Sequence, residues 1–251
     1  MKLSAVLLVQ NQILLNKYNY NSYRPIGTIT ETIDRLQELQ VDEIVILNKG
    51  HSNSVVDDFF GLFKDTNALR SISTPLAYGG GISELKQAEK LIDSGVERIV
   101  LSACNVSTSL ASSVAEKFGE QSIIFHLPFL VKDKELTFKS GHREHKSEQV
   151  TKALSKNYGG EVILTSIAAE GSGEIDVEQV GNAIKSIPEN LNVMYSGGVS
   201  TVSQIESLAN LELNGICLGN ILNSKEIFIP IAKRSCSKIT RTLNLESLDN
   251  D

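Results

Sequence analysis

Short apolar runs alternate along the chain with longer stretches in which apolar residues recur at helical spacing. Most of the runs are unbroken and rich in Val, Ile and Leu, which is typical of parallel strands buried on both faces. The eight predicted strands are Ala5–Val9, Glu43–Leu47, Pro75–Tyr78, Arg98–Leu101, Ser122–Leu127, Glu161–Thr165, Asn192–Tyr195 and Gly215–Leu218. Helices are predicted at Thr30–Leu39, Glu84–Ser94 and Val177–Ile187, with Ser83 and Ser200 as N-caps and Gly95 after its helix.

Eight alternations of strand and helix predict an α/β protein built as a (β/α)8 TIM barrel. A doubly wound open sheet is the alternative. The barrel is favoured because the chain carries an internal duplication. Tyr78-Gly79-Gly80-Gly81-Ile82-Ser83 recurs as Tyr195-Ser196-Gly197-Gly198-Val199-Ser200, and nine of the 24 positions from Tyr78 to Leu101 are identical in the second copy.

The duplication predicts two (βα)4 halves, at about residues 1–120 and 121–236, within one domain that spans residues 1–251. One such half cannot close a parallel sheet by itself, whereas two fused halves can. The tail at residues 243–251 is acidic and is expected to be flexible.

Two segments interrupt the alternation of strands and helices. Ile13–Lys17 is predicted as an extra strand, followed by a polar segment over Tyr18–Thr28, and Phe129–Ser140 has the pattern of a hairpin. Both segments follow predicted strands. They should therefore lie at the C-terminal mouth of the barrel, where active sites of this fold are built.

Composition excludes several classes of protein. Hydrophobic residues make up 41% of the 251 positions, which suffices for a sizeable core, and no apolar run reaches membrane-spanning length. A net charge of −6 argues against nucleic acid as the main partner. The three cysteines are widely spaced and indicate neither a disulfide framework nor a metal site, which favours a reducing cytoplasm. No cofactor is expected.

The two glycine turns are candidate phosphate sites. Glycine lets the backbone approach a ligand closely, and a helix that begins after the turn points N–H groups toward it. The predicted phosphate-binding residues, at the ends of strands in both halves, are Gly80, Gly81, Ser102, Ala103, Gly171, Ser196, Gly197, Gly198, Gly219 and Asn220. Two such sites would suit a substrate with a phosphate at each end. Alternatively, the glycines only make tight turns between strand and helix.

The duplication, the two glycine turns and the segment Glu161–Ile167 together make the chain resemble the cyclase subunit of imidazole glycerol phosphate synthase, over nearly its whole length to about Ile231. This resemblance implies a (β/α)8 barrel with two phosphate sites. It also implies a glutaminase subunit docked on the N-terminal barrel face, which supplies ammonia through the barrel axis. The ammonia would serve cleavage of a ribulosyl aminoimidazole carboxamide nucleotide.

The resemblance fails at the catalytic positions. The family uses two aspartates as general acid and base, and Leu8 and Pro128 stand in their places. Neither side chain can exchange a proton, so ordinary cyclase chemistry is not expected. Gln10, His126 and Glu170 are the candidates for a substitute. The family's lysine aligns with Asn16, next to Lys17.

Charged residues at the opposite end match the family better. Lys2, Glu43, Arg98 and Glu161 fall on the positions of the charged ring that gates ammonia entry in the family. Charges directed into a barrel are unfavourable unless they are paired. A purely structural layer of salt bridges that plugs the barrel is an equal alternative.

Three functions remain open. A branch of the family shares Leu7-Leu8-Val9-Gln10-Asn11 in the first strand and is associated with amidination of surface-glycan sugars. The first hypothesis is therefore an ammonia-receiving subunit of a glutamine amidotransferase system, with a glutaminase partner and a phosphorylated small molecule as a further ligand. The second is an authentic cyclase with relocated catalytic residues. The third is a non-catalytic scaffold or activator of a glutaminase.

Overall fold

A computed structural model describes residues 1–18, 22–50, 54–63, 69–104, 108–133, 135–140, 143–155, 160–223 and 228–239. The predicted tail at 243–251 lies outside these ranges. The strands of the barrel are β1 (Lys2–Gln10), β4 (Glu43–Asn48), β5 (Leu76–Gly79), β6 (Arg98–Ser102), β7 (Ile123–Lys132), β10 (Glu161–Ser166), β11 (Asn192–Ser196) and β12 (Gly215–Leu218). The helices are α1 (Ile29–Glu38), α2 (Val55–Gly61), α4 (Leu85–Asp93), α5 (Thr108–Phe118), α6 (Ser147–Leu154), α7 (Val177–Ile184), α8 (Val202–Leu208) and α9 (Phe228–Ser235).

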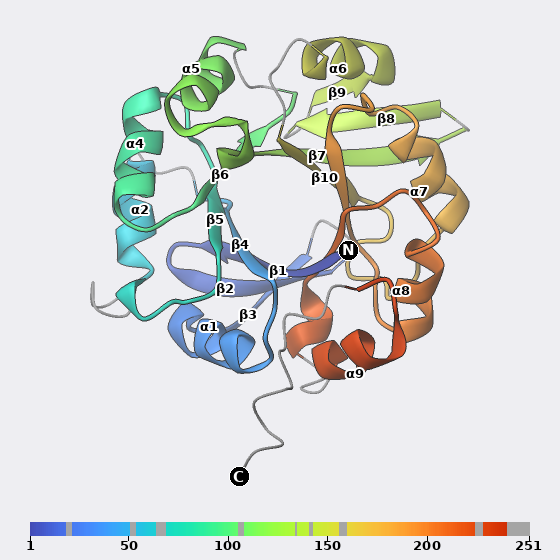
Figure 1. The fold of residues 1–251 in the computed structure, drawn as a ribbon, viewed down its shortest axis with the longest axis horizontal. Helices are drawn as coiled ribbons and strands as arrows, with labels where there is room; N and C mark the ends of the chain where they lie inside the picture. The colour runs from blue at the N-terminus through green and yellow to red at the C-terminus, as the bar shows by residue number, and fades with distance from the viewer. Residues whose placement is uncertain are drawn as a thin grey trace.

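The eight strands close into a parallel barrel. They pair in chain order from β1 to β12, β7 pairs with β10, and β12 pairs back onto β1. Figure 1 shows the strands as an inner ring with the helices outside it. The predicted (β/α)8 fold, built from two duplicated halves, is therefore confirmed, and the open doubly wound sheet is excluded.

Each barrel strand is buried on both faces, which explains the unbroken apolar runs. The outward side chains join the helices in one large core that includes Leu3, Ile44 and Leu164. The inward side chains form a second cluster of seven buried residues, one from each barrel strand except β1, and Val6 of β1 and Leu47 of β4 are partly buried and pack against it. We call this layer the apolar belt: Val6, Val45, Ala77, Val100, Ile124, Ile163, Met194 and Cys217. The belt fills the middle of the barrel, so it is a packed layer rather than an open pore.

Helix starts differ by one residue from the prediction. The N-caps are Glu84 and Thr201, not Ser83 and Ser200. The reason is a glutamine one turn into each helix. Gln204 Oε1 accepts the backbone N–H groups of both Ser200, at 2.7 Å, and Thr201, at 3.0 Å. Gln87 does the same in the first half. Gly95 follows the α4 C-cap with a φ of 105°, as expected for a helix end.

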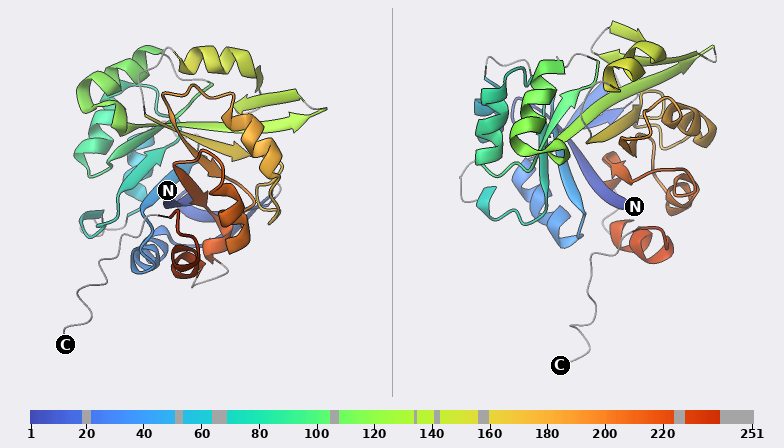
Figure 2. Two further views of the ribbon diagram at one scale, coloured as in Figure 1. Left: turned by 45° about the vertical axis from the view of Figure 1, so that its right-hand side comes forward. Right: turned by 45° about the horizontal axis from the view of Figure 1, so that its top comes forward.

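Two strand additions project from the mouth of the barrel. β2 (Ile13–Tyr18) confirms the predicted extra strand, but the following polar segment contains a further strand, β3 (Ser22–Gly27), that pairs with β2. The predicted hairpin is β7 with β8 (Glu135–Ser140), and the unexpected β9 (Arg143–Lys146) extends it. Figure 2 shows this yellow-green extension reaching away from the barrel, and α6 packs against it.

Within the described ranges, no helix combines the length and the apolar character that crossing a membrane requires.

Candidate functional site

A cavity of about 240 Å³ opens at the mouth of the barrel, between the strand ends of the second half and β1 and β2 of the first half. We call it the mouth cavity. Its walls come from the ends of β1 and β12, from β2, and from the turns after β10 and β11. Its floor reaches Val6 and Cys217 of the apolar belt. Of the predicted phosphate-binding residues, it brings together Gly171, Ser196, Gly197, Gly198, Gly219 and Asn220.

The glycine turn at the cavity has a backbone that only glycine accommodates. Gly198 has a φ of 73°, and a Cβ there would lie 2.0 Å from the carbonyl oxygen of Glu174. Gly173, which the sequence analysis missed, faces the same cavity with a φ of 78°. Within the described residues, the N–H groups of Gly173 and Gly198 make no hydrogen bond. They are therefore available to a ligand. The turn Gly171-Ser172-Gly173 was the sequence signal for the missed residue.

A pair of asparagines fixes the wall of the cavity that β2 provides. Asn220, which begins the short 3₁₀ helix Asn220–Asn223, accepts the backbone N–H of Lys17 through Oδ1 at 3.2 Å and donates from Nδ2 to the Lys17 carbonyl oxygen. Asn223 donates to Asn16 Oδ1 at 2.7 Å. The Asn220 side chain therefore holds the β2 strand in place rather than pointing to a ligand.

Lys17 and Glu170 are the charged side chains that line the mouth cavity. Burial lowers the pKa of Lys17, although Glu170 opposes the shift. Burial raises the pKa of Glu170, and Lys17 opposes that shift. Burial thus favours the neutral form of each residue, whereas the opposite charge of its partner favours the charged form. The pair offers the cavity a cation and a group able to hold or release a proton.

The other catalytic candidates lie less favourably. His126 Nε2 is 3.1 Å from Thr165 Oγ1 inside the barrel, and burial, with the nearby Lys17, lowers the pKa of His126 to about 4. It is therefore neutral at pH 7. Gln10 ends β1 beside Ile13 of β2 and is not among the residues that line the mouth cavity. Leu8 lines the cavity, and Pro128 pairs with Thr165 in the barrel wall.

The glycine turn of the first half has different surroundings. Gly80, with a φ of 137°, packs against the backbone of Asn48, whose side chain donates to Asp58 Oδ2 at 3.2 Å and to the Tyr78 hydroxyl at 3.1 Å. Gly81 packs near Val55. Two other residues predicted to bind phosphate in this half already have partners. The Ser102 hydroxyl lies 3.3 Å from the hydroxyl of Ser140, and the Ala103 N–H donates to the His126 carbonyl oxygen at 3.1 Å.

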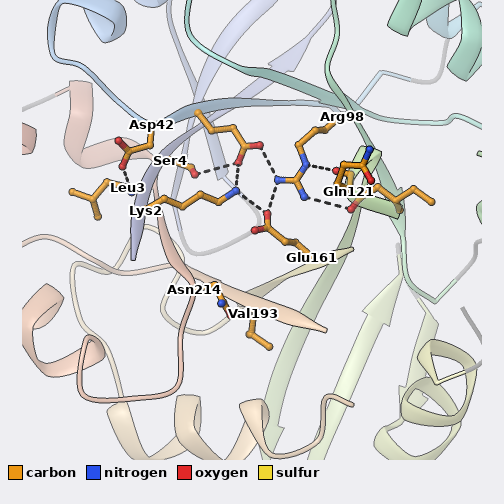
Figure 3. Close-up of polar contacts among 11 residues, drawn as sticks. Lys2, Leu3, Ser4, Asp42, Arg98, Gln121, Glu161, Val193 and Asn214 are labelled. Carbon is orange, nitrogen blue, oxygen red and sulfur yellow. Dashed lines mark hydrogen bonds and ion pairs between the residues drawn. The ribbon is translucent and has the colours of Figure 1, made fainter. Parts of the chain in front are cut away.

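At the opposite end of the barrel, Lys2, Glu43, Arg98 and Glu161 form a closed cycle of ion pairs, which we call the ion ring. Lys2 Nζ is 3.0 Å from Glu43 and 2.7 Å from Glu161, while Arg98 Nη1 is 2.9 Å from Glu43 and 2.5 Å from Glu161. Figure 3 shows Lys2, Arg98 and Glu161 converging from separate strands. The four residues predicted from the sequence thus meet, with signs alternating around the cycle.

The ion ring is largely withdrawn from solvent and its charges balance. The Glu43 side chain is 3% exposed, those of Arg98 and Glu161 are 14% exposed, and that of Lys2 is 24% exposed. Burial would raise the pKa of Glu161, but Arg98 and Lys2 outweigh it and hold that pKa below its usual range. Arg98 also donates from Nε to the Gln121 carbonyl oxygen at 2.9 Å. The apolar belt lies next to the ring, because Val45, Val100 and Ile163 each stand two residues after a ring member on the same strand. On β1, Ser4 lies between Lys2 and Val6 and donates to Glu43.

Among the described residues, no group of three His, Cys, Asp or Glu side chains could hold a metal ion.

Comparison with known proteins places this geometry in context. The family model described as "Histidine biosynthesis protein" matches residues 8–228. The chain is 27% identical over 238 residues to the Leptospira interrogans protein named "Putative imidazole glycerol phosphate synthase subunit HisF", covering 90% of this chain and 91% of that protein. It is 25% identical over 242 residues to imidazole glycerol phosphate synthase subunit HisF of Sulfurisphaera tokodaii, covering 93% and 94% of the two chains.

Proposed function

The chain belongs to the histidine biosynthesis protein family, and on that premise we propose that it is a cyclase-like barrel that receives ammonia within a glutamine amidotransferase system. A glutaminase docks on the N-terminal face, ammonia crosses the barrel, and a phosphorylated small molecule binds at the mouth. The acceptor is a surface-glycan sugar, amidinated in the cytoplasm with the help of a separate amidotransferase.

The ion ring is the observation that carries this proposal. Among the described residues, the four charges pair with one another and form a closed, charge-balanced entrance. Ions that enter such a ring would have to separate its pairs in a medium of low dielectric constant, which is unfavourable. Lys2 holds its partners through one ammonium group on a flexible stem and is the most exposed of the four. Its movement would open the ring most readily.

The apolar belt favours neutral ammonia over ammonium as the species that crosses. A charged ion would lose its hydration among Val45, Val100 and Ile163, whereas ammonia carries no net charge. The belt is packed, so passage requires side-chain motion. Val6 and Cys217 are its members that also line the mouth cavity, and they mark the exit. Burial raises the pKa of Cys217, which keeps its thiol neutral.

Leu8 and Pro128 argue against the ordinary cyclase reaction, because neither residue can replace an aspartate as acid or base. The second candidate, an authentic cyclase with relocated residues, is favoured by Glu170 alone, whose carboxyl faces the mouth cavity and has a raised pKa. Direct assay separates the two. With ammonia supplied in solution, we expect formation of imidazole glycerol phosphate far below about one turnover per second. Turnover at that rate would support the second candidate instead.

The ammonia route is tested with three purified components: this chain, a class I glutaminase and a separate amidotransferase. Co-purification reports docking, glutamine hydrolysis reports activation, and mass spectrometry of the sugar reports ammonia delivery. In Lys2→Met and Arg98→Ala, we expect docking to survive while the ratio of amidated sugar to hydrolysed glutamine changes at least about threefold. Lys117→Met, at the exposed pair with Glu89, is the matched control and should change neither quantity.

Two outcomes would overturn the proposal. If no glutaminase binds, the ion ring is a structural plug. If both ring variants lose thermal stability yet keep the wild-type ratio of amidated sugar to hydrolysed glutamine, the protein activates its glutaminase as a scaffold without conducting ammonia.

A further inference from the structure

We propose that the mouth cavity binds a small open-chain aldehyde or ketone covalently, through a Schiff base between the amino group of Lys17 and the carbonyl carbon, with Glu170 as the proton donor. The inference rests on the proposed function in one respect: it takes the mouth cavity as a ligand site. The reaction itself requires neither ammonia nor a partner protein.

The position of Lys17 is fixed by its strand. Asn220 binds both the backbone N–H and the backbone carbonyl of Lys17, and the strand register places Tyr23 of β3 opposite Lys17. Lys17, Leu8 and Glu170 all line the mouth cavity. A primary amine at a fixed place in a cavity can attack a bound carbonyl group, provided that the amine is neutral.

Two features of the surroundings favour the neutral amine. Burial lowers the pKa of Lys17, Glu170 opposes this shift, and the positive charge of Lys49 adds to it. Lys49 is held beside β3, with its Nζ 3.5 Å from the centre of the Tyr23 ring. His126, buried inside the barrel within electrostatic reach of Lys17, is itself neutral at pH 7. Burial and a neighbouring cation are two means by which proteins make a lysine nucleophilic.

The leucine at position 8 removes a carboxylate that would oppose this chemistry. Leu8 stands where the cyclase family has a catalytic aspartate, and it pairs with Leu15, two residues before Lys17 on β2. An aspartate there would face the same cavity and hold the amine in its charged form. Glu170 is the only carboxylate among the described residues that line the cavity. The loss of the family's acid–base pair therefore creates the condition for a different reaction.

Protons and bonds balance within the pair of Lys17 and Glu170. Burial raises the pKa of Glu170, although Lys17 opposes that shift, so burial favours a carboxylic acid that can donate its proton. The Lys17 nitrogen forms a bond to the carbonyl carbon, and the carbonyl oxygen takes the proton of Glu170. The Glu170 carboxylate then accepts a proton from the nitrogen and returns it to the new hydroxyl group, which leaves as water. The products are a protonated imine on Lys17, the Glu170 carboxylate and one water molecule, and nothing is oxidised or reduced.

The volume of the mouth cavity limits the ligand. A water molecule takes up about 30 Å³ in the liquid, so 240 Å³ corresponds to roughly eight waters. This is room for a carbonyl compound of about eight non-hydrogen atoms, such as a short ketose. It is too small for a nucleotide. Asn16 lines the same space and can hydrogen-bond a hydroxyl group of the ligand.

Reductive trapping on the purified full chain tests the inference. Dihydroxyacetone is the probe, and sodium cyanoborohydride converts any Schiff base into a stable secondary amine that peptide mass spectrometry locates. At pH 7 we expect Lys17 to be labelled at least about tenfold faster than Lys132, an exposed lysine at the end of β7. Lys132→Arg is the control and should leave the rate at Lys17 unchanged.

Substitutions at Leu8 test whether the surroundings make the amine reactive. Leu8→Asp should slow labelling of Lys17 at least about tenfold, because the new carboxylate keeps the amine charged. Leu8→Asn has nearly the same shape without the charge, and it should slow labelling less than about threefold. The asparagine variant therefore also controls for any disturbance of the cavity wall.

Glu170→Gln tests the proton donor, and two opposite effects compete in it. Removing the negative charge leaves more of the Lys17 amine neutral, which would speed labelling, whereas removing the acid slows it. The second effect should dominate, because a positioned acid or base is typically worth about 100- to 10,000-fold in rate. We expect labelling of Lys17 in this variant to be at least about tenfold slower than in the wild type.

Three results would each overturn this inference. They are labelling of Lys17 no faster than that of Lys132, equal rates in Leu8→Asp and Leu8→Asn, and labelling in Glu170→Gln no slower than in the wild type. These results are independent of the ammonia route, because they need no partner protein. A chain that conducts ammonia could fail this test, and a chain that binds no glutaminase could pass it.

Discussion

Replacing Arg98 by methionine removes one charge from the ion ring while nearly conserving side-chain volume. Glu43 and Glu161 would then share Lys2 alone, leaving one negative charge in excess. Breaking a buried ion pair by removing one partner typically costs about 3–5 kcal/mol. Glu43 is 3% exposed, so water can compensate little. We expect the free energy of unfolding to fall by about 3–5 kcal/mol.

The assay is urea unfolding at pH 7, followed by circular dichroism, together with the melting temperature. For a chain of this length, about 1 kcal/mol corresponds to roughly 2–4 °C, so the melting temperature should fall by roughly 6–20 °C. Lys117→Met at the exposed Lys117–Glu89 pair is the control, and its effect should stay below about 1 kcal/mol. This comparison contrasts the stability lost at a buried ion pair with that lost at an exposed ion pair of the same molecule.

A double variant tests the reasoning further. Arg98→Met combined with Glu161→Gln restores charge balance, because Lys2 and Glu43 remain as a pair 3.0 Å apart. We expect it to be more stable than Arg98→Met alone by at least about 1 kcal/mol, a coupling typical of residues in one network. Two results would refute the account of a coupled buried ring. One is an Arg98→Met variant that loses no more stability than Lys117→Met. The other is a double variant whose loss of stability equals the sum of the losses in Arg98→Met and Glu161→Gln.

Two further predictions concern the mouth. The pKa of His126 is about 4 in the native state and about 6.5 in the unfolded state. As the pH decreases, the unfolded state therefore binds a proton before the native state does. The free energy of unfolding should then fall between about pH 6.5 and 4, by on the order of 3 kcal/mol. His126→Gln should flatten that slope in urea unfolding measured at pH 7 and 4.5, and an unchanged slope would assign the effect to other groups. Asn220→Ala removes both side-chain hydrogen bonds to the Lys17 backbone and should lower the local stability of β2 by about 1–3 kcal/mol. Amide hydrogen exchange should become faster in β2 and stay unchanged in β12. An equal change of exchange rate in both strands would show that Asn220 does not hold the hairpin.

The barrel could be predicted from the sequence because its strands are buried on both faces. A run such as Ile44-Val45-Ile46 has no polar side to obscure it, and the duplication supplies each strand twice. The strands that prediction missed lack this signal. β3 carries Arg24 and Pro25 and is mostly exposed, and β9 consists of Arg143, Glu144, His145 and Lys146. Their existence depends on pairing with β2 and β8, which local pattern does not encode.

The candidate site was predictable in part for the same reason. The ion ring was predicted from the resemblance to the cyclase family, and its four members are the first residues of their strands. The glycine turns were predicted from their repetition. The role of Asn220 did not follow, because its partner Lys17 is 203 positions away in the chain. Nor did the contact between Ser102 and Ser140, which depends on where the β8 strand returns. The role of a side chain that contacts a distant backbone segment or hairpin can be assigned only from the tertiary structure.

The ion ring also bears on how the chain folds. Its members are far apart in sequence: Lys2 and Glu161 are separated by 159 residues, and even the nearest bonded pair, Lys2 and Glu43, by 41. Contacts between residues so far apart in sequence form slowly, because a long loop of chain must close before each contact can form. Lys2, Glu43 and Arg98 all belong to the first half and carry an excess positive charge, which Glu161 of the second half neutralises. The charges of the ring therefore balance only after the second half has been synthesised and has packed against the first.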